Sequence, residues 1–414
     1  MSKDSLKRTL SKSKVLKVLW HFCKWLFVEV IFETIMMIFP VKKNKIVACN
    51  FYGSQYGDNP KYIVDELLKL DESHELDIVW VLDKRKVSKR ELPKYVRDVE
   101  YGTLRYFYEL STAKVWIDNA RKMLVPRKKR SQFYVQTWHG SIGVKKVEKD
   151  ANMPREYNRR ARKDSKYADI FLSGNKFTTQ LYRDAYWYNG EIMEYGSPKF
   201  DKIMNRIGDA VYEKKIKEKV LGSLGIKEGT KTVLYAPTFR EKGDDNCYDI
   251  DYQRLRNILE EKYNGSWAIL LRFHPNISGR NMNRQWGDGV YDVTKYPDLY
   301  EILPICDMVI TDYSSVGFEA AIINKPVFIY ASDYEEYKKD ERGFYLDLKD
   351  LPFPFAEDND ALIKNIIKYD ISDSKKINQK IMKIFGVNET GKSAKMIAKR
   401  IFETVDIADQ NDKL

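Results

Sequence analysis

Two of the four histidines stand where an enzyme often places its chemistry, at the end of an apolar run. Trp138 and His139 follow residues 133–137, and His274 follows residues 269–273. An imidazole accepts or donates a proton near neutral pH, so each is a candidate catalytic residue. Metal binding by the histidine pair is the competing interpretation. No third ligand recurs at ligand spacing, and we therefore expect no metal.

Residues that could donate hydrogen bonds to a phosphate group lie in the second half of the chain. Ser314 and Ser315 lie between a β-branched run and an amphipathic segment, where a helix N-terminus with free N–H groups attracts anions. The other donor-side candidates are Arg272, Thr238, Arg240, Arg342 and Gly343. No Gly-x-Ser-x-Gly pattern surrounds Ser314, which disfavours a serine hydrolase.

Candidates for the acceptor side surround His139. They are Trp138, Gly140, Asn119 and Lys145, with Lys146 and Lys149 extending the basic stretch. Such lysines suit a polyanionic or lipid-phosphate substrate, although a solvated helix face has the same pattern. Transfer of a sugar phosphate or alditol phosphate needs donors for a diphosphate leaving group and a base for the acceptor hydroxyl. His274 with its neighbours fits the first task and His139 the second.

The elements that must position these residues alternate between strand and helix. Short apolar runs occur at residues 46–49, 77–82, 113–117, 133–138 and 170–172, and again at 232–237, 267–273, 308–311 and 327–330. Helical patterns separate them, which predicts an α/β protein with mostly parallel sheets. Two doubly wound, Rossmann-like domains would hold a ligand in a central cleft, at the carboxyl ends of their strands. The candidate residues around His139, Thr238, His274 and Ser314 each follow one of these predicted strands.

Length and pattern divide the 414 residues into four parts. We expect an N-terminal Rossmann-like acceptor domain over 45–205, a C-terminal Rossmann-like donor domain over 206–390, and a helix with a tail over 391–414. Residues 1–44 are basic and aromatic, without the ~18 consecutive apolar residues of a spanning helix. This pattern favours an amphipathic helix on an anionic membrane, with a helix buried against the protein as the alternative and a tilted span as the minority option.

Bulk properties narrow the class of partner. The formal net charge of +12 favours anionic partners. Because no nucleic-acid motif is present and the charges are dispersed, we expect no nucleic acid, and a basic binding protein without activity is the weakest hypothesis. The four cysteines are scattered, which disfavours a zinc module and a disulfide scaffold and fits a reducing cytoplasm.

Four spaced motifs together resemble the CDP-glycerol glycerophosphotransferase family, the teichoic-acid primases and polymerases of Gram-positive bacteria. The motifs are Gln136-Thr137-Trp138-His139-Gly140-Ser141, Arg272-Phe273-His274-Pro275, Thr311-Asp312-Tyr313-Ser314-Ser315-Val316 and Arg342-Gly343-Phe344-Tyr345. The resemblance extends in order over roughly residues 45–405. One departure is Gly140-Ser141-Ile142, because the family often has Gly-Thr-Pro after the Trp-His pair.

The resemblance implies a GT-B-like fold and an enzyme on the cytoplasmic face of the cell membrane, bound peripherally. It also implies no bound cofactor, CDP-glycerol as the donor, CMP as a product, and a lipid-linked glycan or polyol phosphate as the acceptor. By motif position His139 is the base, and His274, Ser314 and Ser315 hold the donor diphosphate, with Thr238 and Arg240 near it. CDP-ribitol is the alternative donor. A nucleotide-sugar glycosyltransferase is the less favoured reaction, and homo-oligomers, primase and polymerase all stay open.

Overall fold

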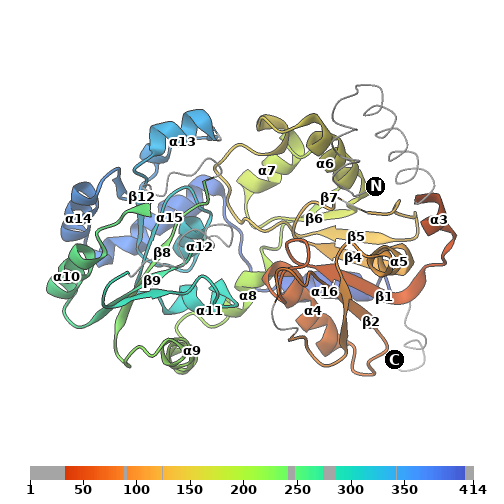
Figure 1. Ribbon diagram of the computed structural model, residues 1–414, viewed down its shortest axis with the longest axis horizontal. Coiled ribbons are helices and arrows are strands. Elements are labelled where there is room, and N and C mark those ends of the chain that lie inside the picture. Colours follow the sequence, from red (N-terminus) through yellow and green to blue (C-terminus); the bar gives the residue numbers. More distant parts are fainter. Residues whose placement is uncertain are drawn as a thin grey trace, which may run out of the picture.

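The computed structural model describes residues 33–87, 91–123, 125–240, 248–273, 286–341 and 343–405. These residues form an α/β protein with two parallel sheets side by side (Figure 1). His274, Arg342 and most of the predicted amphipathic segment lie outside the described residues. None of the helices in the described ranges combines the length and the apolar character that a membrane span requires.

The first sheet has, within the described residues, seven parallel strands in the order β3-β2-β1-β4-β5-β6-β7. The strands are β1 (Lys42–Cys49), β2 (Asp77–Leu82), β3 (Val96–Glu100), β4 (Ala113–Asp118), β5 (Phe133–Gln136), β6 (Ile170–Leu172) and β7 (Glu191–Met193). The helices of this half are α3 (Glu33–Ile38), α4 (Asp58–Leu70), α5 (Leu104–Thr112), α6 (Arg155–Tyr167) and α7 (Lys176–Asp184). The strand order reverses between β1 and β4, and such a reversal is the usual ligand position of a doubly wound sheet.

The second sheet repeats this plan. Its six described strands run in parallel in the order β10-β9-β8-β11-β12-β13, so the order reverses between β8 and β11. The strands are β8 (Lys231–Ala236), β9 (Trp267–Leu271), β10 (Val290–Asp292), β11 (Met308–Thr311), β12 (Val327–Tyr330) and β13 (Phe355–Ala356). The helices are α9 (Ala210–Ser223), α10 (Tyr252–Tyr263), α11 (Leu299–Ile302), α12 (Val316–Ile322), α13 (Tyr334–Asp340), α14 (Asn359–Lys368) and α15 (Ser374–Phe385).

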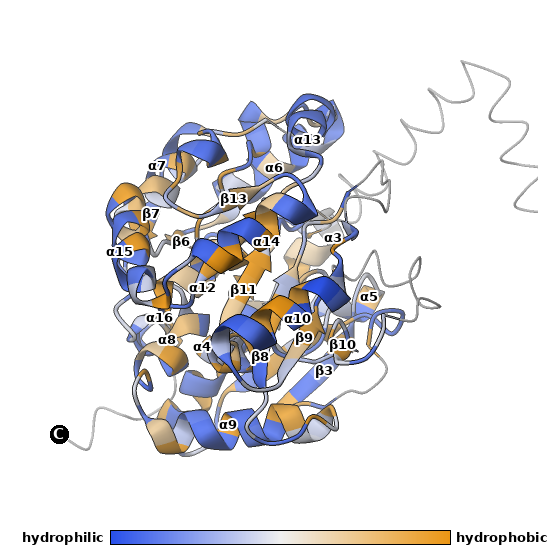
Figure 2. Cartoon of the chain, turned by 90° about the vertical axis from the view of Figure 1, so that its left-hand side faces the viewer, coloured by the Kyte–Doolittle hydropathy of each residue, from blue (hydrophilic) through white to orange (hydrophobic). Residues whose placement is uncertain are grey.

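The central strands are apolar because helices cover both of their faces. In Figure 2, β11 is mostly orange, whereas α10 and α14 alternate between orange and blue. Helix α12 packs especially closely on the sheet, because a Cβ atom added to Gly317 would lie 2.8 Å from Thr311 Cγ2. Glycine therefore allows the segment that begins with Ser314 and Ser315 to start directly above the end of β11.

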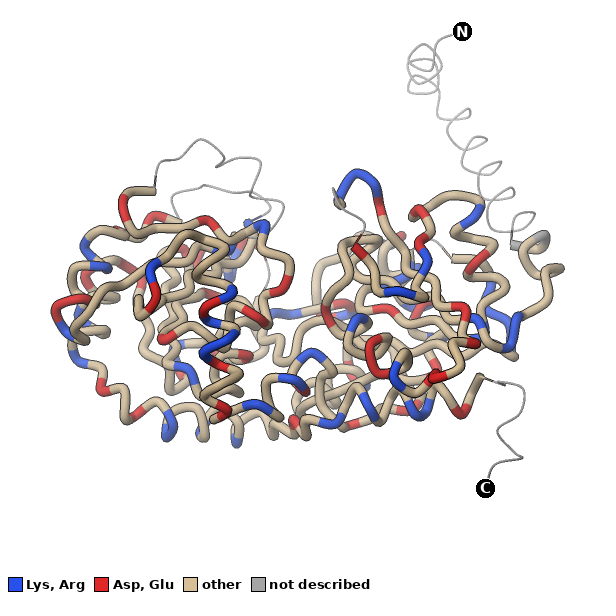
Figure 3. Tube along the Cα trace, turned by 90° about the horizontal axis from the view of Figure 1, so that it is seen from below, with Lys and Arg blue, Asp and Glu red and all other residues tan. Residues whose placement is uncertain are grey.

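The two halves are joined twice along the chain. Helix α8 (Pro198–Met204) lies between them, and α16 (Ser393–Phe402) returns from the second half to pack beside α4 of the first (Figure 1). Ile397 and Ile401 of α16 belong to the same hydrophobic cluster as Ile63 and Leu67 of α4. The last helix therefore completes the core of the N-terminal half. Lysines and arginines are interspersed with acidic residues over both halves (Figure 3).

Candidate active site

His139 lies just beyond β5, half-buried, with its ring oriented by one hydrogen bond. Its Nδ1 lies 2.8 Å from the backbone oxygen of Asn119. A carbonyl oxygen only accepts hydrogen bonds, so Nδ1 carries the proton and the lone pair of the neutral ring is on Nε2. Burial lowers the pKa of His139 below its ordinary value, with Lys199 and Lys145 acting in the same direction. The ring is thus suited to accept a proton at neutral pH.

The backbone around His139 is strained. Phe51, Asp58 and Trp138 all have positive φ values, of 41°, 53° and 52°. Side chains other than glycine rarely adopt this conformation, and it recurs at functional sites because the surroundings must hold it in place. Two of these residues contact the imidazole: the ring centroids of Trp138 and Phe51 lie 4.6 Å and 4.9 Å from that of His139.

Asn119 is the link that holds this strained region together. It is fully buried, and its side-chain amide donates to Asn50 Oδ1 at 2.8 Å and to Asp58 Oδ1 at 3.0 Å, while its own oxygen accepts from Phe51 N at 2.9 Å. Asn50 follows β1 and Asn119 follows β4, so the network spans the point where the strand order reverses. Asn119 thus supports His139 through its backbone oxygen, and its side chain bonds to other protein groups.

Lys199 of α8 connects His139 to the second half of the molecule. Its buried ammonium donates to the backbone oxygen of His139 at 2.5 Å and to Glu319 Oε1 of α12 at 3.0 Å, and it lies 3.8 Å from Asp58 Oδ2. Tyr300 donates to the other oxygen of Glu319 at 3.0 Å. Although burial opposes it, the carboxylates of Asp58 and Glu319 raise the pKa of Lys199. The loop that carries His139 is therefore tied to the helix that Ser315 precedes.

Hydrogen bonds and an ion pair also link the two strands between which the order of the second sheet reverses. Thr238, just after β8, donates its backbone N–H to both carboxylate oxygens of Asp312 at 2.9 Å, and Asp312 directly follows β11. Arg240 is buried, pairs with Asp312 at 2.8 Å and donates twice to Asp333, at 2.6 and 2.9 Å. Its guanidinium thus already donates to protein acceptors, so any contribution to donor binding would be indirect. The buried hydroxyl of Thr238 has no hydrogen-bond partner among the described residues.

The remaining donor-side candidates lie around this edge. Ser315 precedes α12 without capping it, and Ser314 Oγ accepts a long hydrogen bond of 3.4 Å from Val316 N. Arg272, after β9, donates through Nη1 to the backbone oxygens of Val293 and Tyr296. Burial lowers the pKa of Arg272, and within the described chain no carboxylate lies within ion-pair distance of it.

Gly343 and Lys145 meet where the two halves touch. Gly343 O accepts from Lys146 N at 2.8 Å, Tyr345 N donates to Val144 O at 2.8 Å, and Lys145 pairs with Phe344 as an antiparallel bridge. Gly343 therefore joins the two halves through its backbone. Gly140, one residue after His139, faces open space, since an added Cβ would have no neighbour within 4 Å.

The structure thus brings together His139, Trp138, Asn119 and Gly140 at one reversal point, and Thr238 and Arg240 at the other, with Ser314 and Ser315 in the loop that follows Asp312. Sequence reasoning missed Asp58, Lys199 and Glu319. Asp58 closes the loop after the first predicted strand, a position equivalent to those that were selected. Lys199 follows none of the predicted strands. The buried Glu319 had no signal of its own.

Comparison with known proteins is consistent with this arrangement. The family model described as CDP-glycerol:poly(glycerophosphate) glycerophosphotransferase matches residues 31–403. The teichoic acid poly(glycerol phosphate) polymerase of Staphylococcus epidermidis is 31% identical over 80% of this chain, and the chain spans 46% of that protein, about half its length. The protein of the same name from Bacillus spizizenii is 30% identical, with 82% of this chain and 87% of that protein covered. A teichoic acid poly(ribitol-phosphate) polymerase from the same organism matches at 26% identity, over 81% of this chain and 52% of that protein.

A solved structure extends the likeness to three dimensions. The wall teichoic acid polymerase TagF is 28% identical, with a TM-score of 0.77 over 90% of this chain and 92% of that one. The family match covers both sheets and the returning helix α16. The chain belongs to the CDP-glycerol:poly(glycerophosphate) glycerophosphotransferase family.

Proposed function

We propose that the protein transfers glycerol phosphate from CDP-glycerol to a hydroxyl group of a teichoic acid or capsule acceptor and releases CMP. The observation that carries this proposal is the hydrogen bond from His139 Nδ1 to the Asn119 carbonyl, which leaves Nε2 as the base. Membership of the family supports the choice of donor. Two relatives named for poly(glycerol phosphate) are 31% and 30% identical, whereas one named for poly(ribitol-phosphate) is 26% identical, so CDP-ribitol remains the second choice.

The proposed reaction is a displacement at phosphorus. The acceptor oxygen attacks the phosphorus that bears glycerol, its proton passes to His139 Nε2, and the bond from that phosphorus to the bridging oxygen breaks. CMP leaves with the bridging oxygen, whose growing negative charge needs donors. Ser314, Ser315, Arg272 and the indirect support of Arg240 are the described groups that we assign to this task, and His274, Arg342 and Gly343 remain sequence-based predictions.

The two parallel sheets, connected through α8 and again through α16, support a GT-B-like arrangement in which donor and acceptor meet between the halves. In this proposal the N-terminal half holds the acceptor and the C-terminal half holds CDP-glycerol. Residues 1–44 would attach the enzyme to the cytoplasmic face of an anionic membrane. Removal of residues 1–40 should release the protein from anionic vesicles and spare turnover of a soluble acceptor.

The first experiment incubates the purified protein with a lipid-phosphodisaccharide acceptor analogue and either CDP-glycerol or CDP-ribitol, and it measures CMP and product mass. We expect CMP with CDP-glycerol. His139→Asn should abolish turnover and leave donor binding intact, because the amide can still donate to the Asn119 carbonyl but has no basic nitrogen. The product ladder distinguishes the addition of one unit from the addition of many.

A matched control is His74→Asn. His74 is exposed, and the centroid of its ring lies 3.7 Å from that of the stacked ring of Tyr95. Its positive φ of 57° is one that asparagine tolerates. The control should retain full turnover. Normal activity in His139→Asn would refute the assigned base, and release of UDP or GDP from sugar nucleotides would favour a glycosyltransferase instead.

A further inference from the structure

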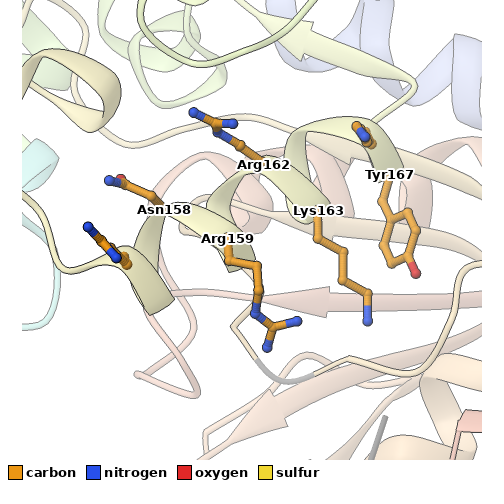
Figure 4. A pocket seen from close by; sticks show the side chains of 7 residues that line it. Asn158, Arg159, Arg162, Lys163 and Tyr167 are labelled. Atoms are coloured by element: carbon orange, nitrogen blue, oxygen red, sulfur yellow. The ribbon is translucent and has the colours of Figure 1, made fainter. Parts of the chain in front are cut away.

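One face of α6 carries a stripe of cations along its whole length. Arg155, Arg159, Arg162, Lys163 and Lys166 line a groove of about 560 Å³ on this face, together with Asn158 and Tyr167. Figure 4 shows Arg159 and Lys163 extending side by side from the helix. We call these five cations the α6 stripe. Their spacing of three and four residues is that of one helix face.

Helix α6 carries six cations and two acids. Its two acids are Glu156, which pairs with Arg159 and Arg160, and Asp164, which is buried and pairs with Arg121. The stripe thus has a net positive charge, with Glu156 as the nearest exposed acid of the helix. An interfacial membrane helix carries Trp, Phe or Leu on its contact face, and the α6 stripe has none of these. The face therefore fits a hydrophilic polyanion better than a lipid surface.

Side-chain contacts connect α6 to the loop of the candidate base. Tyr157 of α6 donates to Glu148 Oε1 at 2.9 Å, and Glu148 pairs with Arg121 at 3.2 Å. The guanidinium of Arg121 lies 5.5 Å from the centroid of Trp138, the residue before His139. Asp164, near the other end of α6, pairs with the same Arg121 at 3.1 Å. These contacts fix α6 along its length relative to the loop of His139, and the stripe spans about 17 Å of the helix.

We propose that the α6 stripe binds the phosphates of the growing acceptor polymer while its terminal hydroxyl lies at His139. This inference rests on the proposed function. Cations four residues apart on a helix are separated by about 6 Å along the axis. A glycerol phosphate unit has at most six backbone bonds, twice those of an amino-acid residue, so its phosphates are at most about 7 Å apart. The two repeats match closely enough for successive phosphates to meet successive cations.

The binding test uses lipid-free poly(glycerol phosphate) chains without donor. A variant with Arg155→Gln, Arg159→Gln, Arg162→Gln and Lys166→Gln should bind long chains about ten-fold more weakly, since each exposed pair contributes modestly, and with a shallower salt dependence. A control with Lys375→Gln, Lys376→Gln, Lys380→Gln and Lys383→Gln makes the same charge change on exposed positions of α15. It should bind like the wild type. Replacement of the stripe arginines by lysine should preserve binding.

The turnover test compares acceptors with one and with many glycerol phosphate units. The stripe variant should keep wild-type turnover of the short acceptor and lose the advantage of the long one. Three results would overturn the inference: an equal loss of polymer binding in the α15 control, unchanged polymer binding by the stripe variant, or a loss of binding to phosphatidylglycerol vesicles alone. The last result would indicate that the stripe faces a membrane surface. Failure of the proposed function is a separate result, because wild-type protein would then release no CMP even with the short acceptor.

Discussion

The buried ion pair between Lys199 and Glu319 makes a strong prediction. Both side chains are at most 2% exposed, and Lys199→Met removes the cation while keeping the length of the side chain. Glu319 would retain its hydrogen bond from Tyr300 and lose its counter-charge. Removal of one partner from a buried pair costs about 3–5 kcal/mol, so we expect the free energy of unfolding to fall by that amount.

Urea unfolding measures this loss, and two further variants define its origin. Lys199→Met with Glu319→Gln leaves no buried charge at this pair and should recover most of the stability. Lys202→Met changes an exposed lysine of the same helix and should shift stability by no more than about 0.5 kcal/mol. If Lys199→Met unfolds at the wild-type urea concentration, or if the double variant is no more stable than the single one, the pair does not join the two halves as described.

The same variant has an effect that loss of stability alone would not produce. Lys199 lowers the pKa of His139, so its removal should raise that pKa. The acidic limb of the pH profile of kcat/KM should then move to higher pH. An unchanged limb in a folded Lys199→Met protein would contradict the electrostatic link between Lys199 and the base.

Three other predictions concern pH and packing. Because burial lowers the pKa of His139, the acidic limb of kcat/KM in the wild type should have its midpoint below pH 6.5, and a midpoint above this would oppose His139 as the base. Burial raises the pKa of Glu389 from 4.5 to about 8, so the folded state keeps a proton that the unfolded state loses. The free energy of unfolding should therefore fall as pH rises from about 5 to 8. Glu389→Gln should flatten this slope in urea unfolding at several pH values. Gly317→Ala should destabilise the protein by about 1–3 kcal/mol in thermal or urea unfolding, because its Cβ would meet Thr311 Cγ2, and a stabilised variant would show that α12 can shift.

The sequence predicted the centres of both sheets well. The apolar runs at 77–82, 170–172, 308–311 and 327–330 are β2, β6, β11 and β12 with the same bounds. These strands are buried or nearly so, which leaves a continuous apolar run in the sequence. The missed strands β3, β7, β10 and β13 are the four outer strands of the two sheets. They are short and partly exposed, so their sequences lack that signal.

The candidate site was predictable to the extent that strand ends mark it. His139, Thr238 and Ser314 follow strands, and the sheet topology brings such positions to one edge. The partners that fix them were not predictable, because the Asn119 carbonyl, Lys199 and Glu319 act through contacts between residues 20 and 120 positions apart. A sequence pattern shows which residues end a strand, and only the folded chain shows which of them touch.

The return of α16 to the first half has a consequence for synthesis on the ribosome. Ile63 and Leu67 of α4 share a core with Ile397 and Ile401, and about 190 further residues are translated between α8 and α16. At about 5–20 residues per second this takes roughly 10–40 s, during which the apolar face of α4 awaits its partner. The second sheet lies on one continuous stretch, residues 231–356, and has no such delay. We therefore expect the nascent C-terminal half to reach its final packing before the N-terminal half, the reverse of the order in which they emerge.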